Sequence, residues 1–317
     1  GKVSPASQRF MGTTDTQLKA GVIGAGVFGG HHARKYAASP RVQLAGVFDV
    51  DAARAEKLAD DLGTRAFADM SELIAACDAV TVASPAMAHY DGVKAALSAG
   101  RHVLVEKPLA DTAARGRELI DIARANDLVL QVGHQERFVF NAMGVFGIAE
   151  APRRIAARRM GLRSTRNLDV SVTVDLMIHD LDLVMALAQA PMTGLEARAR
   201  KIFTDLPDAA EARLTFADGF EAVLESSRAA DALDRVMRID YANGFLEVDF
   251  VAKTFINETG FDLNPDFAED PKARDSLGAN VNAFIESVLD GAPVAVPAEA
   301  GLAALAVARD IDRAAAL

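Results

Sequence analysis

Three side chains of this 317-residue sequence have the types needed for acid–base chemistry on a hydroxyl group: Lys107, Asp175 and His179. Asp175 and His179 are four positions apart, so on a helix they share one face. Apolar residues such as Leu176 and Leu181 surround them, and a carboxylate and an imidazole in an apolar segment need a reason. An imidazole titrates near neutral pH, so His179 could take the proton of a hydroxyl group whose carbon gives up a hydride.

Each of these side chains has more than one interpretation. Asp175 and His179 could form a buried pair that only fixes a helix, but Lys107 favours catalysis, because an ammonium group could stabilise a developing alkoxide or relay the proton. Asp175 could orient either the substrate or the histidine. Asp182 is a substrate contact or a helix-surface acid. We expect no metal site, because the six histidines offer no third ligand at a recognisable spacing.

A glycine-rich stretch, Gly24-x-Gly26-x-x-Gly29, has the spacing of a dinucleotide-binding loop. The first glycine allows a tight turn, the second lets the backbone approach a pyrophosphate, and the third lets the following helix pack closely. A plain turn is the alternative for such a motif alone. Asp49 follows Gly29 by 20 positions, where it would accept hydrogen bonds from ribose hydroxyls. Its charge would repel a 2′-phosphate, so we expect NAD rather than NADP.

Alternating strands and helices must position that loop. Short apolar runs predict strands at 18–23, 42–48, 79–83, 102–105 and 129–132. Helical patterns lie between them at 51–62, 89–99 and 112–126. Such alternation predicts βαβ units with a parallel sheet.

The pattern changes after about residue 134. Consecutive strands are expected at 153–160, 195–203, 210–216, 220–227, 236–241 and 245–251. Tight-turn residues at 217–219 and 243–244 predict antiparallel pairing. Helices are expected at 176–189, 280–289 and 298–316. The chain is thus predicted to be α/β, with a doubly wound parallel sheet followed by an α+β domain.

Together these motifs resemble the Gfo/Idh/MocA (glucose–fructose oxidoreductase / inositol dehydrogenase) family. The matching stretches are Gly24-x-Gly26-x-x-Gly29, 83–85 with His89, 102–108, 131–133, Arg137-Phe138, Asp175-x-x-x-His179-x-x-Asp182 and 283–293. The resemblance covers nearly the whole chain from residue 18. It implies a Rossmann domain, a second domain with a large open, mainly antiparallel sheet, and NAD(P)-dependent oxidation of a sugar or cyclitol hydroxyl. It also suggests a homodimer or homotetramer.

The resemblance carries site residues with it. It implies that Lys107, Asp175 and His179 are catalytic and that the Lys107–Pro108 peptide bond is often cis. Besides the three glycines and Asp49, the cofactor-binding residues it implies are Val27, Phe28, Ser84, Pro85, His89, Glu106, Lys107 and Gln135.

Six arginines in fourteen residues suggest an anionic substrate: Arg153, Arg154, Arg158, Arg159, Arg163 and Arg166. A solvated face with acidic partners is the alternative for some of them. Arg163 and Arg166 precede the catalytic segment, and guanidinium groups match phosphate oxygens. The expected substrate-binding residues are Arg137, Arg163, Arg166, Asp175, His179 and Asp182.

The substrate class follows from a closer resemblance. Residues 133–138 and 175–182 are similar to the family's UDP-N-acetylglucosamine 3-dehydrogenases, although Val139-Phe140-Asn141 replaces the usual Asn-Pro. The leading interpretation is an NAD-dependent dehydrogenase that oxidises the 3-hydroxyl of this nucleotide sugar. A dehydrogenase of a free sugar or inositol is the alternative within enzymes. A non-catalytic NAD-binding sensor is the alternative outside them, but it would have no use for the three catalytic side chains together.

Composition limits the other possibilities. The net charge of -10 disfavours nucleic-acid and anionic-membrane binding. Cys77 is the single cysteine, which excludes an internal disulfide and fits a reducing cytoplasm. At about 150 residues per domain, the length predicts two domains. We expect a cofactor domain at 18–134 and a substrate-binding and oligomerisation domain at 135–317, whose C-terminal helices pack back on the first. Residues 1–17 are expected to be disordered or not native, with Met11 as the native start.

Overall fold

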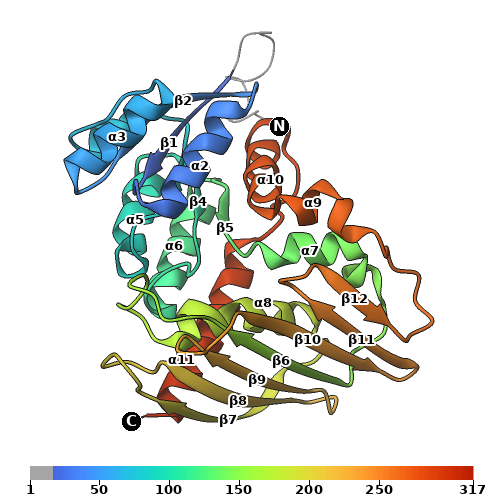
Figure 1. Cartoon of the computed structure of the whole chain (residues 1–317). Helices are drawn as coiled ribbons and strands as arrows, with labels where there is room; N and C mark the ends of the chain where they lie inside the picture. The colour runs from blue at the N-terminus through green and yellow to red at the C-terminus, as the bar shows by residue number, and fades with distance from the viewer. Residues whose placement is uncertain (1–16, 317) are drawn as a thin grey trace. The chain divides into compact units, whose positions relative to one another are not determined.

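A computed structural model describes residues 17–316 (Figure 1). Contacts divide this part of the chain into two compact units. Unit 1 comprises 17–106, 118–133 and 280–297, and unit 2 comprises 107–117, 134–279 and 298–316. The segment expected to be disordered lies outside the described residues, apart from Gln17, whose side-chain amide donates to the carbonyl of Pro40 at 3.0 Å.

Unit 1 contains a five-stranded sheet with the order β2-β1-β3-β4-β5, in which all neighbours are parallel. The strands are β1 (Leu18–Ile23), β2 (Val42–Phe48), β3 (Ala79–Val82), β4 (His102–Val105) and β5 (Leu130–Val132). The strand order reverses direction at β1 and β3, and ligands of doubly wound sheets bind at the carboxyl ends of the strands at this point. The glycine loop follows β1, and Ser84 and Pro85 follow β3 closely.

The helices of unit 1 connect these strands. They are α2 (Val27–Ala38), α3 (Ala52–Leu62), α4 (Met70–Ala75) and α5 (His89–Ser98). Residues 118–125 of α6 (Ala113–Ala125) and 280–290 of α10 (Ser276–Asp290) also belong to this unit. The Asp51 carboxylate accepts the Arg54 N–H and caps α3, and Gly63 ends that helix at a φ of 65°. Helix α4 was not expected from the sequence.

Unit 2 contains a seven-stranded sheet with the order β12-β11-β10-β6-β9-β8-β7. The strands are β6 (Arg154–Met160), β7 (Met192–Arg200), β8 (Ala209–Phe216), β9 (Glu221–Ser227), β10 (Asp234–Tyr241), β11 (Gly244–Asp249) and β12 (Thr254–Asn257). The hairpins β8–β9 and β10–β11 form as predicted. Strand β12 was not expected, and β6 pairs with β9 in parallel. The second domain therefore has a mainly, not wholly, antiparallel sheet.

Helices of unit 2 pack on this sheet, with α11 contacting α8, β7 and the turn before α8 (Figure 1). The helices are α7 (Glu136–Met143), α8 (Ile178–Leu187), α9 (Pro271–Arg274) and α11 (Ala298–Ala314). A π-helical turn, Thr173–Met177, leads directly into α8. No helix among residues 17–316 is long and apolar enough to span a bilayer.

The alternating apolar residues of the strands lie in the core of unit 2. Leu224, Leu246 and Val248 are at most 1% exposed within the single chain. These alternating positions therefore form part of the core and not an uncovered apolar face. The outward positions instead carry cross-strand ion pairs, such as Arg198 with Glu211 at 2.9 Å.

Candidate active site

The glycine loop of unit 1 leaves room for a ligand at one position. Gly24 has a φ of +102°, and a Cβ on it would stand 2.6 Å from the backbone of Ala83 and Ser84. A Cβ on Gly29 would stand 1.7 Å from the carbonyl oxygen of Gly24. By contrast, apart from Gly26 and its two chain neighbours, no atom of residues 17–316 lies within 4 Å of the Cβ position of Gly26. The chain's own packing thus explains Gly24 and Gly29. The open space at Gly26 fits the approach of a pyrophosphate.

The start of α2 also fits an anion. Gly26 stands at the N-cap position and supplies no side-chain cap to the first amides of the helix. Such amides, together with the helix dipole, favour a phosphate. Val27 and Phe28 follow and are about half exposed, at 51% and 45%.

Asp49 is held beside the same loop at the end of β2. Its Oδ2 accepts the N–H of Ala25 at 2.7 Å, and its Oδ1 accepts the N–H of Asp51 at 2.8 Å. A carboxylate oxygen has a further lone pair, so Asp49 keeps capacity to accept ribose hydroxyls. These residues fit the adenosine and pyrophosphate parts of a dinucleotide.

Two other expected cofactor residues have protein partners. His89 Nε2 donates to the carbonyl of Ser84 at 2.8 Å, so His89 fixes the loop that carries Ser84 and Pro85. Glu106 Oε1 lies 2.5 Å from His32 Nε2, on the buried side of α2. His32 also contacts Thr81 at 3.3 Å, so Glu106 belongs to a buried polar network.

Lys107 is anchored in unit 2 by the main chain of the π-helical turn. Its Nζ donates to the carbonyl oxygen of Asp175 at 2.5 Å and to that of Val174 at 3.4 Å. The same Nζ lies 3.8 Å from Asp175 Oδ1. The Lys107–Pro108 peptide bond is cis, as the resemblance implies. Because π-helical turns often occur at functional sites, this arrangement supports the expected role of the segment.

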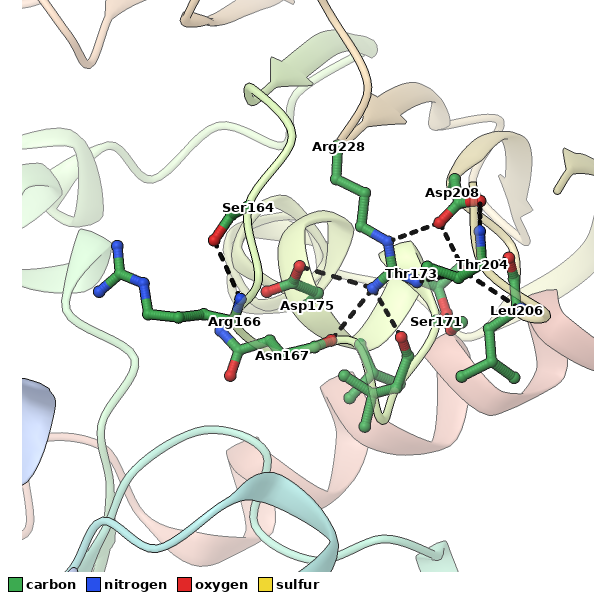
Figure 2. Close-up of polar contacts among 12 residues, drawn as sticks. Ser164, Arg166, Asn167, Ser171, Thr173, Asp175, Thr204, Leu206, Asp208 and Arg228 are labelled. Atoms are coloured by element: carbon green, nitrogen blue, oxygen red, sulfur yellow. Dashed lines mark hydrogen bonds and ion pairs between the residues drawn. The ribbon is translucent and has the colours of Figure 1, made fainter. Parts of the chain in front are cut away.

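Asp175 lies between two cations. Arg228 Nη1 stands 3.8 Å from Asp175 Oδ2 (Figure 2), and Lys107 Nζ stands 3.8 Å from the other carboxylate oxygen. Burial raises the pKa of Asp175, while the charges of Lys107 and Arg228 oppose that rise. The two cations thus favour the ionised carboxylate in a buried position.

His179 is the second residue of α8, and its side chain is neutral. Burial lowers its pKa well below the ordinary value, and the positive charges of Lys107 and Arg159 lower it further. Within residues 17–316, Nδ1 is buried without a hydrogen-bond partner, and no hydrogen bond joins His179 to Asp175. The structure therefore gives no support to a pair that only fixes a helix, and it leaves a neutral imidazole that can accept a proton.

Arg137 and Asp182 pair with each other. The guanidinium donates to both carboxylate oxygens, at 2.8 and 2.9 Å, and the Asp182 side chain is 2% exposed. Both were expected to bind substrate, and this bidentate pair gives them a structural role. Gln135 Oε1 accepts a hydrogen bond from Ser276 Oγ at 3.4 Å.

The arginines of residues 153–166 differ in their surroundings: within the described part of the chain, some pair with acidic residues, and others do not. Arg154 and Arg158 pair with acidic residues on the outward face of the sheet, as the solvated-face interpretation holds. Arg163 stands 5.0 Å over the ring of Phe203. The side chain of Arg166 extends away from Arg228 and Asp175 (Figure 2).

Two arginines of unit 2 are buried: Arg159, which the sequence analysis placed in the arginine segment without a specific role, and Arg228, which it did not single out. Arg159 pairs with Glu136 at 3.3 Å and with Asp180 at 3.0 Å. Asp180 is the residue that follows His179 in the chain. Arg228 contacts Asp175 from the end of β9. No spacing links Arg228 to the catalytic motif, because 53 residues separate it from Asp175. In the described part of the chain, no group of three or more His, Cys, Asp and Glu side chains could hold a metal.

Comparisons with known proteins agree with this geometry. Residues 18–134 match the oxidoreductase family with an NAD-binding Rossmann fold, and residues 146–247 match the GFO/IDH/MocA C-terminal domain. The UDP-N-acetylglucosamine 3-dehydrogenase of Acidithiobacillus ferrooxidans is 36% identical over 305 residues, which cover 93% of this chain and 96% of that protein. Its solved structure has a TM-score of 0.85 and covers 94% of this chain and 97% of its own.

Two further proteins extend the comparison. The inositol 2-dehydrogenase of Acidothermus cellulolyticus is 32% identical over 198 residues, which cover 59% of this chain and 58% of that protein. The myo-inositol dehydrogenase of Lactobacillus casei, solved with NAD(H) and myo-inositol, shares the fold at 22% identity and a TM-score of 0.78, over 94% of each chain. These findings confirm the predicted fold, cofactor and reaction class. The chain belongs to the GFO/IDH/MocA family, as an NAD-dependent dehydrogenase that acts on the CH–OH groups of sugars.

Proposed function

We propose that the chain oxidises a nucleotide sugar, UDP-N-acetylglucosamine, at its 3-hydroxyl, with NAD as the acceptor. The observation that carries the chemistry is the neutral, half-buried His179, four residues after Asp175, whose carbonyl oxygen holds the Lys107 ammonium. The choice of substrate is supported by the name of the relative that matches 93% of this chain.

Each catalytic residue has one task in this proposal. His179 accepts the hydroxyl proton, and because Nδ1 is buried we assign this step to Nε2. The ammonium of Lys107 stabilises the negative charge that develops on the sugar oxygen. Asp175 accepts a hydrogen bond from the substrate and orients it.

The cofactor supplies the hydride acceptor. Gly26, the first amides of α2 and Asp49 would hold NAD through its pyrophosphate and its ribose. When bound there, NAD would supply the acceptor for the hydride of the sugar carbon. The carbon then becomes a ketone once His179 has removed the hydroxyl proton.

Arg163 and Arg166 are the proposed contacts for the diphosphate. A charge-assisted hydrogen bond is worth about 1.5–3 kcal/mol, so Arg163→Ala or Arg166→Ala should raise KM roughly ten- to hundredfold. Arg198→Ala is a matched control, because Arg198 is 87% exposed and pairs with Glu211 on the sheet.

The deciding test compares NADH formation from UDP-N-acetylglucosamine, free N-acetylglucosamine and myo-inositol. The proposal expects the highest kcat/KM for the nucleotide sugar and a KM effect of the two arginine variants with that substrate alone. Higher efficiency with either free compound would instead favour a free-sugar or inositol dehydrogenase. The inositol 2-dehydrogenase relative is the observation that keeps this second candidate.

A further inference from the structure

A buried ion pair, Arg228 with Asp208, lies beside the proposed catalytic carboxylate of Asp175 (Figure 2). Asp208 ends the loop between β7 and β8 and is 0% exposed. Its Oδ2 accepts the N–H groups of Ile202, Phe203 and Thr204 at 2.7, 2.9 and 3.1 Å. Burial alone would raise the pKa of Asp208, but these donors hold it well below its ordinary value. Asp208 is therefore a fixed anion.

Most N–H groups of the Arg228 guanidinium donate hydrogen bonds to oxygen atoms of the protein. Nε donates to Asp208 Oδ1 at 2.9 Å, and Nη2 donates to Thr204 Oγ1 at 3.2 Å. Nη1 donates to the carbonyls of Val170 at 2.7 Å and Asn167 at 3.1 Å. The side chain is 4% exposed. A guanidinium held by four hydrogen bonds on three sides cannot turn toward a substrate, so its role is to hold other groups.

The contact of Arg228 with Asp175 is ionic. At 3.8 Å, the distance between Nη1 and Oδ2 exceeds a hydrogen bond, and both Nη1 hydrogens already serve carbonyl groups. Lys107 stands at the same distance from the other oxygen. The carboxylate is thus flanked by two charges and accepts a hydrogen bond from the Asn167 side chain, and its remaining lone pairs can accept a substrate hydroxyl.

We propose that Arg228 is a positioning residue for the dehydrogenation: anchored by Asp208, it fixes residues 167–170 and holds the Asp175 carboxylate in its working orientation. This inference rests on the proposed role of Asp175. It also gives a reason for the contact of Arg228, after β9, and of the loop between β7 and β8, which carries Asp208, with the chain just before Asp175.

The charges around Asp175 set the expected pH effect. Burial raises the pKa of Asp175, Lys107 and Arg228 oppose the rise, and Asp169 adds to it. Arg235 is a further cation that interacts with this carboxylate. Removing the Arg228 charge should therefore raise the pKa of Asp175 further.

The test uses three variants of the full chain and one control. Arg228→Gln removes the charge, Arg228→Lys keeps the charge but loses the planar fork, and Asp208→Asn weakens the anchor. Arg213→Gln is the control, because Arg213 forms an exposed pair with Glu221 on the same sheet. The readouts are kcat and kcat/KM against pH with the best of the three substrates above, NAD affinity, and the titration of Asp175 by difference infrared spectroscopy against Asp175→Asn.

For Arg228→Gln, we expect kcat to fall about 10- to 100-fold and the acid limb of kcat/KM to move up by about one pH unit. Arg228→Lys should lose kcat but keep the acid limb near its wild-type position. NAD affinity and the control should not change. If Arg228→Gln does not fold, Arg228→Lys and Asp208→Asn carry the same test through kcat.

Two outcomes would overturn the inference. If all three variants lose only thermal stability while kcat and the Asp175 titration stay as in the wild type, Arg228 is merely structural. If Asp175→Asn turns over substrate normally, the proposed role of Asp175 fails first, and this inference falls with it. If Asp175→Asn loses activity while the Arg228 and Asp208 variants keep theirs, the role of Asp175 stands and only the role of Arg228 is overturned.

Discussion

Two ionisable side chains of unit 2, Asp175 and His179, respond in complementary ways to the cations around them. Lys107 opposes the rise that burial causes in the pKa of Asp175, and it adds to the lowering that burial causes in the pKa of His179. For a carboxyl group a lower pKa favours the anion, and for an imidazole it favours the neutral form. One local excess of positive charge thus prepares an acceptor for a hydroxyl hydrogen bond and a base for a proton.

Replacing either proposed acid–base residue should stop turnover without affecting NAD. General acid–base groups contribute about 100- to 10,000-fold, so we expect Lys107→Ala and His179→Ala each to lose kcat by this range. NAD affinity, measured by calorimetric titration, should stay as in the wild type. His31→Ala is the control, because His31 is an exposed residue of α2. A variant with near-native kcat on the true substrate would remove that residue from the mechanism.

The depressed pKa of the half-buried His179 should also make stability fall at low pH. Its pKa is far below 6.5 in the folded state, whereas the unfolded chain takes up a proton near 6.5. Below that pH the unfolded state binds more protons, so this contribution to stability is present above pH 6.5 and is lost as the pH falls.

Urea unfolding at pH 7.5 and 5.5 measures this effect. We expect the wild type to lose about 1 kcal/mol more of its unfolding free energy than His179→Gln between the two pH values. His31→Gln should behave as the wild type. Equal losses in the wild type and His179→Gln would mean that His179 is not buried as a neutral group.

Cofactor choice depends on Asp49. Its carboxylate, held by two backbone N–H groups, would repel a 2′-phosphate, and Val50 and Asp51 bring no positive charge nearby. We expect calorimetric titration to show tighter binding of NAD(H) than of NADP(H), and Asp49→Ser to reduce the difference. Equal or tighter binding of NADP(H) to the wild type would refute this role.

At the scale of elements, short sequence patterns were sufficient to predict the strands and turns that depend on neighbouring residues. The five parallel strands and the glycine loop follow from apolar runs and turn residues, and the hairpin turns of the second sheet follow from Asn243-Gly244 and 217–219. The four-residue strand β12 and the parallel pairing of β6 with β9 depend on contacts distant in sequence. The π-helical turn was also missed, because the carbonyls of Val174 and Asp175 are satisfied by Lys107 from another part of the chain.

The glycine loop provides a matched pair of variants at the start of α2. In Gly29→Ala the new Cβ would stand 1.7 Å from the Gly24 carbonyl oxygen, so the loop must shift and Tm should fall by several degrees. In Gly26→Ala the Cβ meets nothing within 4 Å, so Tm should stay near the wild-type value. The same Cβ would occupy the space proposed for pyrophosphate, so NAD affinity should fall at least tenfold. Normal NAD binding by Gly26→Ala would contradict this placement.

At the scale of the whole molecule, the two units hold different parts of the machinery. The glycine loop and Asp49 belong to unit 1, and Lys107, Asp175 and His179 belong to unit 2. The relative from Acidithiobacillus ferrooxidans matches across nearly the full length of both. The family, fold and cofactor therefore follow from the whole chain, whereas the substrate depends on few side chains.

Assembly also belongs to this scale. The outward face of the unit 2 sheet carries charged pairs, and half-buried apolar side chains lie among them, including Val223, Val236 and Phe245. A face with both kinds of residue can pair with a second copy of itself, since stable interfaces combine an apolar centre with a polar rim. We expect light scattering at micromolar concentration to give two or four times the mass of 33.5 kDa.

A single substitution tests whether this face forms the contact. Val223→Lys would bury an unpaired charge in the centre of the interface, so it should shift the protein toward the mass of one chain. Val50→Lys is the control, because Val50 lies in unit 1 and is 94% exposed. A wild-type protein with the mass of one chain would contradict assembly itself. An oligomer that survives Val223→Lys unchanged would place the contact on another surface, and the ion pairs of this face would then be solvated pairs of little energetic weight.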